Sequence, residues 1–331
     1  MNSNNKKYLS SALTIFRNPP INLIDSDALL FKHEYEKRIE GSYYFELKSV
    51  LLFSDTLFSI KKFNFCPSET HINGYFSKKD KIRYIKQIRF PYLRLERGVW
   101  ITQNWTSMYF HWITDALTRY IAVVDKIENA PVLVPKTYQN FPYIREILIF
   151  LNIPHIWFDT TKTTFVNKLY LPSHTSEPGN YNEFYLMKLR GFFLSKIVQK
   201  TPVRKIYISR NKAKSRRVIN EEKLKTIFVK YDIEIHCLEN YSFFDQIKLI
   251  NQSSLLIGPH GAGLTNMLFL QNVAKLVEIR LQNDSSNNCF FSLASALKIP
   301  YYYLIAQICN PETNDMILNI EDFDKLLSKI I

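Results

Sequence analysis

The sequence predicts an α/β protein in which two Rossmann-like domains face each other across a cleft. Its 331 residues suit two domains at about 150 residues each. Apolar residues make up 46% and charged residues 22%, which excludes a disordered or fibrous chain. In the second half, apolar runs of strand length alternate with segments of helical period. We therefore expect an N-terminal domain over residues 1–199 and a C-terminal domain over residues 200–331.

The N-terminal domain has the looser pattern. Strand-like and helix-like segments alternate between residues 90 and 175, which predicts one α/β unit. The strands are expected over 99–103, 131–135 and 168–173, and the helices over 111–127 and 143–152. The first 90 residues show mixed strand signals without a clear period, so their topology stays open.

The C-terminal domain has a regular alternation of five strands with four helices. This pattern is typical of a parallel sheet covered by helices on both faces. The strands are expected over 204–210, 233–239, 253–260, 274–280 and 301–306, and the helices over 220–232, 242–252, 261–270 and 288–298. Such sheets bind ligands at the carboxyl ends of their strands, where helix N-termini offer free N–H groups.

The net charge and the cysteine content indicate which partners and which cellular compartment to expect. The net charge of +13 indicates an anionic partner: a nucleotide, a phospholipid surface or a nucleic acid. The cysteines form no C-x-x-C pair, so we expect buried free thiols at Cys66, Cys237, Cys289 and Cys309. No run of 18 apolar residues is present. We expect a cytoplasmic protein, with peripheral contact at the inner face of the cell membrane.

A glycine-rich turn directly after the expected strand 253–260 is the strongest candidate site. Glycines let the backbone approach a ligand closely, and the N-terminus of the next helix favours negative charge. The turn therefore predicts a binding site for a diphosphate, a diphosphate cradle, although its sequence matches neither the P-loop nor the dinucleotide fingerprint. A glycine turn around a core histidine is the alternative. The residues are Gly258, His260, Gly261, Ala262, Gly263, Leu264, Thr265 and Asn266.

Two further groups fit a nucleotide-binding site. Arg210 follows a strand within a run of seven cations in fourteen residues, where its guanidinium could bind a pyrophosphate, with Arg216 adding to it. Such a run is also typical of a solvated face or of a nucleic-acid or membrane patch. Glu278, expected at the end of the following strand, could accept hydrogen bonds from ribose hydroxyls. A carboxylate paired with Arg280 is the alternative.

His111 and Asp115 are the candidate catalytic pair. Their spacing of four places both side chains on one helix face, and a carboxylate beside a histidine suits a general base. The alternative is a histidine satisfied within the core. Either residue could be the base. The single D-x-D, Asp25 to Asp27, comes too early for a nucleotide-binding unit and reads as a turn or helix cap.

Several of these segments together resemble glycosyltransferase family 61, also called the DUF563 group. They are FHWITDAL, IYISR with a downstream RR, ENYSFFDQIKLI, GPHGAGLTN, VEI and NNCFFSLASAL, in this order over about residues 95 to 305. The resemblance implies a GT-B-like fold and inverting sugar transfer from a nucleotide sugar, usually UDP-linked, with neither an essential metal nor a cofactor. It places the donor on Arg210, the Gly258 to Asn266 turn and Glu278, with His111 and Asp115 as catalytic candidates.

The resemblance leaves the substrates open. UDP-N-acetylhexosamine and UDP-pentose are the donors that it favours. The Lys-, Asn- and Ile-rich composition favours a bacterial surface-polysaccharide enzyme, whose acceptor is a glycan or lipid-linked saccharide of capsule, O-antigen or lipooligosaccharide. One alternative is a non-catalytic protein that binds glycans or sugar nucleotides. A nucleic-acid-binding module is another, but it would leave the glycine turn without a task.

Overall fold

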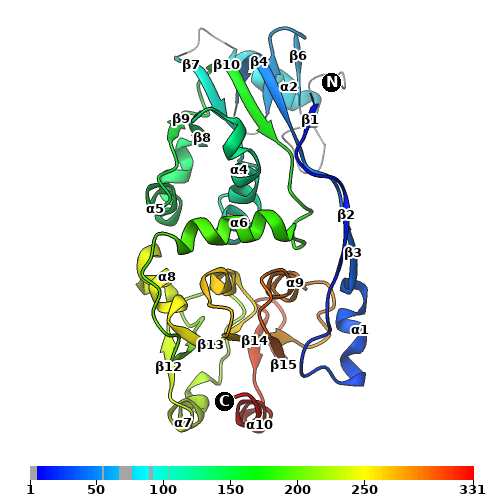
Figure 1. Ribbon diagram of the computed structural model, residues 1–331, viewed down its shortest axis with the longest axis vertical. Coiled ribbons are helices and arrows are strands. Elements are labelled where there is room, and N and C mark those ends of the chain that lie inside the picture. Colours follow the sequence, from blue (N-terminus) through cyan, green and yellow to red (C-terminus); the bar gives the residue numbers. More distant parts are fainter. Residues whose placement is uncertain (1–5, 54–55, 67–76, 89–91, 104) are drawn as a thin grey trace. The chain divides into compact units, whose positions relative to one another are not determined.

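The computed structural model describes residues 6–53, 56–66, 77–88, 92–103 and 105–331. The fold is mixed α/β, as predicted, and the chain divides into two compact units (Figure 1). Unit 1 comprises Met1–Leu13 and Ile39–Pro178, and unit 2 comprises Thr14–Arg38 and Gly179–Ile331. The expected facing of the two domains across a cleft stays a prediction.

The division into units differs from the predicted boundary after residue 199. Residues 14–38 and 179–199, which the sequence assigns to the N-terminal domain, pack within unit 2. Helix α6 (Glu183–Leu194) places the ring of Phe193 5.0 Å from that of Phe269. In α1 (Ala28–Phe31), the ring of Phe31 lies 5.2 Å from that of Phe291. These long-range aromatic contacts leave no local signal in the sequence.

Unit 2 contains a six-stranded sheet with the order β12-β11-β13-β14-β15-β16. Its first five strands are parallel, as predicted, and β16 is antiparallel to β15. Buried parallel strands give continuous apolar runs, which is why the sequence shows them clearly. The strands are β11 (Arg204–Ile208), β12 (Ile233–His236), β13 (Ser253–Pro259), β14 (Lys275–Leu281), β15 (Tyr301–Asn310) and β16 (Asp315–Ile317).

Helices cover both faces of this sheet, with α7 and α10 on one side and α8 and α9 on the other (Figure 1). They are α7 (Lys225–Lys230), α8 (Phe243–Asn251), α9 (Cys289–Ala296) and α10 (Ile320–Ile330). The helix expected over 261–270 is instead a 3-10 helix over Ala262–Phe269, whose first bond joins Leu264 N to the Gly261 carbonyl. Glycines at its start disfavour a regular α-helix.

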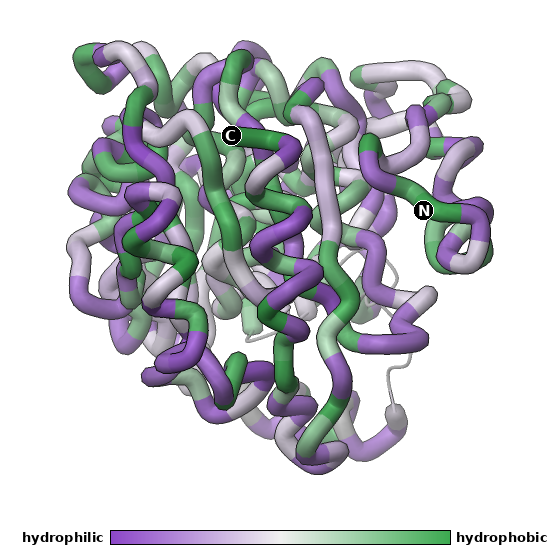
Figure 2. Tube along the Cα trace, turned by 90° about the horizontal axis from the view of Figure 1, so that it is seen from below, coloured by the Kyte–Doolittle hydropathy of each residue, from purple (hydrophilic) through white to green (hydrophobic). Residues whose placement is uncertain are grey.

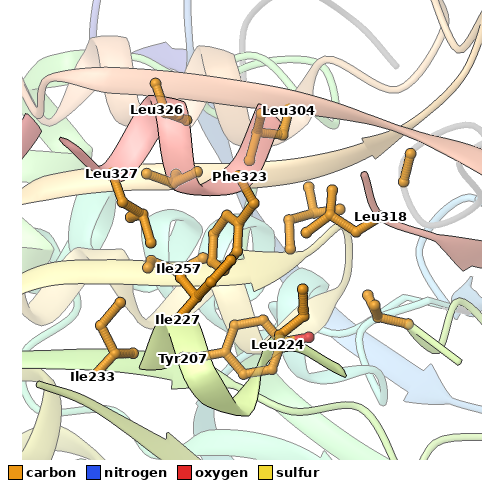
Figure 3. Close-up of a cluster of buried hydrophobic side chains, with 14 of the residues drawn as sticks. Tyr207, Leu224, Ile227, Ile233, Ile257, Leu304, Leu318, Phe323, Leu326 and Leu327 are labelled. Carbon is orange, nitrogen blue, oxygen red and sulfur yellow. The ribbon is translucent and has the colours of Figure 1, made fainter. Parts of the chain in front are cut away.

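The core under α7 and α10 is one apolar cluster centred on Phe323 (Figure 3). Phe323 of α10 and Phe228 of α7 contact each other edge to face, and Phe228 packs on Tyr207 of β11. Hydrophilic and hydrophobic residues alternate along α10 beside the C-terminus (Figure 2). The apolar members Phe323, Leu326, Leu327 and Ile330 are the buried ones, as an amphipathic helix requires.

In its described part, unit 1 contains an eight-stranded sheet with the order β6-β5-β4-β10-β7-β8-β9, and β1 pairs with β4. Strands β10, β7, β8 and β9 are parallel, whereas β4 is antiparallel to β10, β5 and β1. The strands are β1 (Lys6–Tyr8), β4 (Tyr43–Leu52), β5 (Leu57–Ser59), β6 (Asn64–Phe65), β7 (Leu93–Val99), β8 (Val132–Pro135), β9 (His155–Phe158) and β10 (Thr164–Pro172).

The helices of unit 1 agree with the prediction better than its strands do. They are α2 (Lys78–Gln87), α3 (Tyr109–His111), a π-helical turn (Trp112–Ala116), α4 (Leu117–Val123) and α5 (Pro142–Phe150). The strand expected over 99–103 is wrong, because β7 ends at Val99. Its residues 93–99 include charged side chains that hid it, and the short β9 was not predicted.

The first segment of unit 2 lies along the N-terminal half of β15, which β16 does not reach. The side chain of Asn22 bonds both the N–H and the carbonyl of Tyr303, as a neighbouring strand would. Asp25–Asp27 forms a 3-10 turn, as the D-x-D interpretation expected, and Tyr303 donates to Asp27. The segment joins unit 1 through a two-stranded sheet of β2 (Leu13–Phe16) and β3 (Glu36–Ile39).

The cysteines are free thiols, as predicted, but they are not all buried. Cys66 is buried, Cys237 and Cys289 are half-buried, and Cys309 is exposed. Cys309 lies toward the end of β15, where the strand runs on past the core into exposed residues. Burial raises the pKa of the Cys289 thiol to about 12, so that thiol stays protonated near neutral pH.

The central position of Phe323 gives the first prediction. Phe323→Ala should lower the free energy of unfolding of unit 2 by about 3–5 kcal/mol, because it leaves a cavity between α7 and α10. The exposed Phe184 is the matched control, and Phe184→Ala should change stability by less than about 0.5 kcal/mol. Urea unfolding followed by fluorescence measures both changes. Equal transitions for the two variants would contradict the assignment of the core.

Candidate functional site

The glycine-rich turn lies at the carboxyl end of β13 and is open to solvent over two residues. Ala262 is exposed and Gly263 is half-buried, whereas Leu264, Thr265 and Asn266 are buried. Because Ala262 begins the 3-10 helix, the first N–H groups of this helix have no intrahelical partner. The accessible part of the predicted cradle is therefore Ala262 and Gly263, and the buried residues support it from below.

Arg210 lies directly against this turn. Strands β11 and β13 are parallel neighbours, so the residues that follow them emerge at the same edge of the sheet. A Cβ atom on Gly261 would lie only 2.0 Å from Nη1 of Arg210. The φ of Gly261 is 167°, which any residue adopts, so the glycine provides space here rather than an unusual backbone conformation. The structure thus brings together Arg210 and the turn, as the sequence predicted.

The charge of Arg210 has no carboxylate partner within unit 2. Its Nε and Nη2 atoms donate to the Ser215 carbonyl at 3.3 and 3.0 Å. Burial lowers the pKa of Arg210, and the nearby charge of Arg216 lowers it further. Neither of these two arginines forms an ion pair with an acidic side chain of the described residues. Glu239 and Asp315 offset the lowering of the Arg210 pKa only in part, and two close cations without an ion pair favour an anionic ligand.

Arg217, the neighbour of Arg216, has a different role. Its guanidinium binds Asp315 at 2.6 Å, and its backbone N–H donates to the same carboxylate at 2.9 Å. These bonds lower the pKa of Asp315 to about 2. Arg216 has a left-handed backbone, with φ 57°, and its N–H donates to the Thr313 carbonyl. The loop is therefore held by Arg217 and Asp315, which leaves Arg216 available for a ligand.

His260 and Glu278 form a buried pair beside the turn. Nδ1 of His260 lies 2.5 Å from Oε1 of Glu278, and Tyr301 donates to Oε2 at 2.6 Å. Burial raises the pKa of Glu278, but Arg280, His260 and the two hydrogen bonds outweigh it, so the pKa is below its ordinary value. The ionised carboxylate accepts the Nδ1 proton. Only Nε2 of His260 then remains for other partners.

The position of Glu278 differs from the expected strand end. Strand β14 continues to Leu281, and Glu278 lies inside it with no exposed surface. Arg280 lies 3.5 Å from Oε2, as the alternative interpretation expected, although the pair is buried rather than solvated. A ribose hydroxyl could reach Glu278 only if His260 or Tyr301 gave up its bond. The ribose contact stays a prediction, and the observed contact is with His260.

His111 and Asp115 meet, as their spacing predicted. Nδ1 of His111 lies 2.6 Å from Oδ2 of Asp115, and Thr114 donates to Oδ1 at 2.9 Å. The pair spans the end of α3 and the π-helical turn, a wider turn that is common at functional sites. The side chain of His111 is 18% exposed and that of Asp115 is 9% exposed. Nε2 of His111 is the nitrogen left for a substrate.

Sequence reasoning missed two groups close to this pair, the buried Arg119 and the half-buried His174. Arg119 lies one turn after Asp115, and its guanidinium donates to the carbonyls of Ile101 and Pro172. Burial lowers the pKa of Arg119 to about 10, and Asp115 partly offsets this effect. Burial and then Arg119 lower the pKa of His174 to about 4, so its ring is neutral near pH 7. The spacing from Asp115 to Arg119 could have revealed the arginine.

The described residues suit anion binding and proton transfer. They contain no group of three or more His, Cys, Asp or Glu side chains that could hold a metal ion. None of the described helices has both the length and the apolar character that a bilayer crossing requires. Unit 2 offers two cations and free N–H groups at one turn, and unit 1 offers a histidine held by a carboxylate.

Comparison with known proteins gives a family and several relatives. The family described as Glycosyltransferase 61 matches residues 109–277, just over half of the chain. The EGF domain-specific O-linked N-acetylglucosamine transferase of Drosophila melanogaster is 36% identical over 127 residues, 37% of this chain and 23% of the relative. The protein of the same name from Bos taurus is 30% identical over 92 residues, 26% of this chain and 17% of the relative. The matched part spans less than a quarter of each relative.

The neutral His174 gives a prediction for the pH dependence of stability. Its pKa of about 4 lies below the ordinary 6.5, so below pH 6.5 the unfolded chain binds a proton that the native state does not. Stability is therefore intact above pH 6.5 and falls as the pH drops towards 4. His174→Gln should lose less stability between about pH 7.5 and about pH 5 than the wild type does, measured as the urea midpoint. His155→Gln is the control, and an unchanged slope in His174→Gln would contradict the assignment.

Proposed function

Because the chain belongs to the glycosyltransferase 61 family, we propose that it transfers a sugar from UDP to an acceptor hydroxyl, with inversion at the anomeric carbon. The observation that carries the proposal is the packing of Arg210 on Gly261, beside the open N–H groups of Ala262 and Gly263. The names of the relatives support N-acetylglucosamine as the transferred sugar, so UDP-N-acetylglucosamine is the first candidate donor. A UDP-pentose is the second candidate.

The proposed donor site neutralises the departing diphosphate with protein groups. Arg210 can bind it through two N–H groups, and Arg216 adds a second charge. The N–H groups of Ala262 and Gly263 bind a phosphate oxygen at the start of the 3-10 helix, and Nε2 of His260 is the ring nitrogen left to assist them. Because these groups stabilise the developing charge, the proposed reaction needs no metal or cofactor.

His111 is the proposed base. It takes the proton of the acceptor hydroxyl on Nε2 while that oxygen attacks the anomeric carbon. The bond from this carbon to the diphosphate oxygen breaks, and the electron pair leaves with UDP. Asp115 holds Nδ1 and so orients the ring. Asp115 is less suited to be the base, because it is less exposed and His111 and Thr114 already occupy its two oxygens.

We further propose that the two units are the lobes of a GT-B-like glycosyltransferase. The parallel sheet of unit 2 with its donor turn, and the parallel strands β10, β7, β8 and β9 of unit 1, support this proposal. For the acceptor, the composition favours a glycan or lipid-linked saccharide of capsule, O-antigen or lipooligosaccharide. The names of the relatives favour a second candidate, a hydroxyl of an EGF domain.

Hydrolysis of nucleotide sugars tests the proposed reaction. In a panel of UDP-, GDP-, CMP- and dTDP-sugars, the wild-type chain should slowly release free nucleotide from a UDP-sugar and not from the others. His111→Ala should lower turnover by about 10²–10⁴, because it removes the base, and should leave UDP affinity unchanged. His155→Ala is the control and should retain the wild-type rate. A wild-type chain that binds UDP without releasing it from any sugar would instead be a non-catalytic binding protein.

The contact between Arg210 and Gly261 gives a prediction for donor binding. Arg210→Ala should weaken UDP binding by about ten- to a hundredfold, because it removes charge-assisted hydrogen bonds. Gly261→Ala should have a similar effect, since its Cβ displaces Nη1, and the double variant should bind no more weakly than either single one. Gly191→Ala, whose Cβ meets no atom within 4 Å, is the control. Calorimetry that shows additive losses would contradict the shared mechanism.

A further inference from the structure

Among the side chains of helix α2 that the structure describes, one is buried and the others are exposed. Tyr84 is buried against Phe53, with ring centroids 4.9 Å apart. Ile82 and Ile85, three residues apart and therefore on one face, are 55% and 57% exposed. The helix also exposes the lysines Lys78, Lys79, Lys81 and Lys86. Large aliphatic side chains thus lie in solvent among cations.

The turn between β5 and β6 has the same composition. Its residues 60–63 read Ile-Lys-Lys-Phe, and Lys61 and Lys62 are exposed. Phe63 is 84% exposed, which is unusual for a residue of this size. Its φ of 49° is left-handed, a conformation that a bulky residue rarely adopts. The turn therefore exposes an aromatic ring next to two exposed lysines.

The turn and α2 belong to the same face of the sheet. Phe58 and Phe65 are paired across β5 and β6, so their side chains lie on one face. The ring of Phe63 lies 5.5 Å from that of Phe58, and the ring of Phe65 lies 6.1 Å from that of Tyr84. This chain of contacts connects the turn to the helix, and Figure 1 shows α2 beside β6. We call the turn 60–63 together with α2 the lysine–isoleucine face.

The lysines of this face have no acidic partners in the part of the chain that the structure describes. Six lysines, two on the turn and four on α2, form no ion pair with a described carboxylate. Arg83 instead lies over the ring of Tyr84 at 4.5 Å. Such a face attracts an anionic surface, and its exposed apolar side chains gain free energy if that surface also offers an apolar phase.

We propose that the lysine–isoleucine face docks the protein on an anionic lipid bilayer. The lysines lie at the level of the headgroups, and Phe63, Ile82 and Ile85 enter the boundary with the acyl chains. Both the electrostatic attraction of the lysines and the burial of the apolar side chains are needed. Basic segments bind a bilayer by charge, and amphipathic helices also bind it by the apolar area that they bury. A nucleic acid would use the cations but would leave two isoleucines in water, so the exposed aliphatic residues favour lipid.

The inference goes beyond the proposed function and uses none of its residues. The face lies within residues 60–88, whereas the family match covers residues 109–277. It gives a location to the membrane contact that the net charge of +13 indicates. A surface that holds the enzyme at a bilayer would raise the local concentration of a lipid-linked acceptor, but docking itself does not depend on catalysis.

Vesicle sedimentation with the full chain tests the proposal. The wild type should bind vesicles of phosphatidylglycerol and phosphatidylcholine in equal parts, should bind phosphatidylcholine alone far less, and should dissociate as NaCl rises. Lys78→Gln with Lys86→Gln should lower the partition coefficient by about fivefold per lysine. Ile82→Ser with Ile85→Ser should lower it by about tenfold at unchanged salt dependence. All of these positions are exposed, so the variants should keep the wild-type melting temperature.

Matched controls lie on unit 2. Ile219→Ser is the control for the isoleucine variants, because Ile219 is 54% exposed. Lys223→Gln with Lys298→Gln is the control for the lysine variants, because both lysines are exposed. These controls should bind vesicles like the wild type. The proposal is overturned if the wild type does not bind anionic vesicles, or if control and test variants lose binding equally. Single-stranded DNA is then added to the vesicle-bound chain. A nucleic acid would be favoured instead if the DNA displaces the chain from the vesicles, and if Lys78→Gln with Lys86→Gln abolishes this displacement while Ile82→Ser does not.

Discussion

The proposed donor site depends on the packing of the Arg210 guanidinium against the backbone of Gly261. A side chain at position 261 would occupy the space of Nη1, so the charge can reach the turn only because Cβ is absent. The sheet brings the two together, since β11 and β13 are parallel neighbours whose carboxyl ends share an edge. The N–H groups at Ala262 and Gly263 then lie on the turn that the charge reaches. The site requires both the pairing of β11 with β13 and the space left by the missing Cβ of Gly261.

Two of the histidine–carboxylate pairs among the described residues belong to the proposed site, and their surroundings separate their tasks. His111 and Asp115 lie four residues apart on helical turns, and the ring is partly exposed, so a hydroxyl can reach Nε2. His260 directly follows β13 and Glu278 lies in the neighbouring strand β14, where the carboxylate is fully buried beside Tyr301 and Arg280. Proton transfer needs access, whereas orientation of a ring beside a phosphate needs rigidity. The first pair therefore suits a base and the second a positioning element.

The parts of the fold and site that could be predicted are those with local causes. The buried parallel strands of unit 2 are continuous apolar runs, and the pair at 111 and 115 follows from helix spacing. Strand β7 was misplaced because its charged residues break the pattern, and the 3-10 helix after Gly261 cannot be told from an α-helix by composition. The contacts of Glu278 and His174 are tertiary: each depends on a partner brought close by folding, which no spacing along the chain reveals.

The unpaired charges of Arg210 and Arg216 link donor binding to stability. Burial of a cation without a counterion costs free energy, and the lowered pKa of Arg210 reflects both its burial and its repulsion by Arg216. A salt bridge would offset this cost, and the more exposed Arg217 forms one with Asp315 at 2.6 Å. The same salt bridge at Arg210 would have to be broken before a phosphate could bind. In the proposed site, the repulsion between Arg210 and Arg216 persists until an anion binds, and its relief would add to the affinity for a diphosphate.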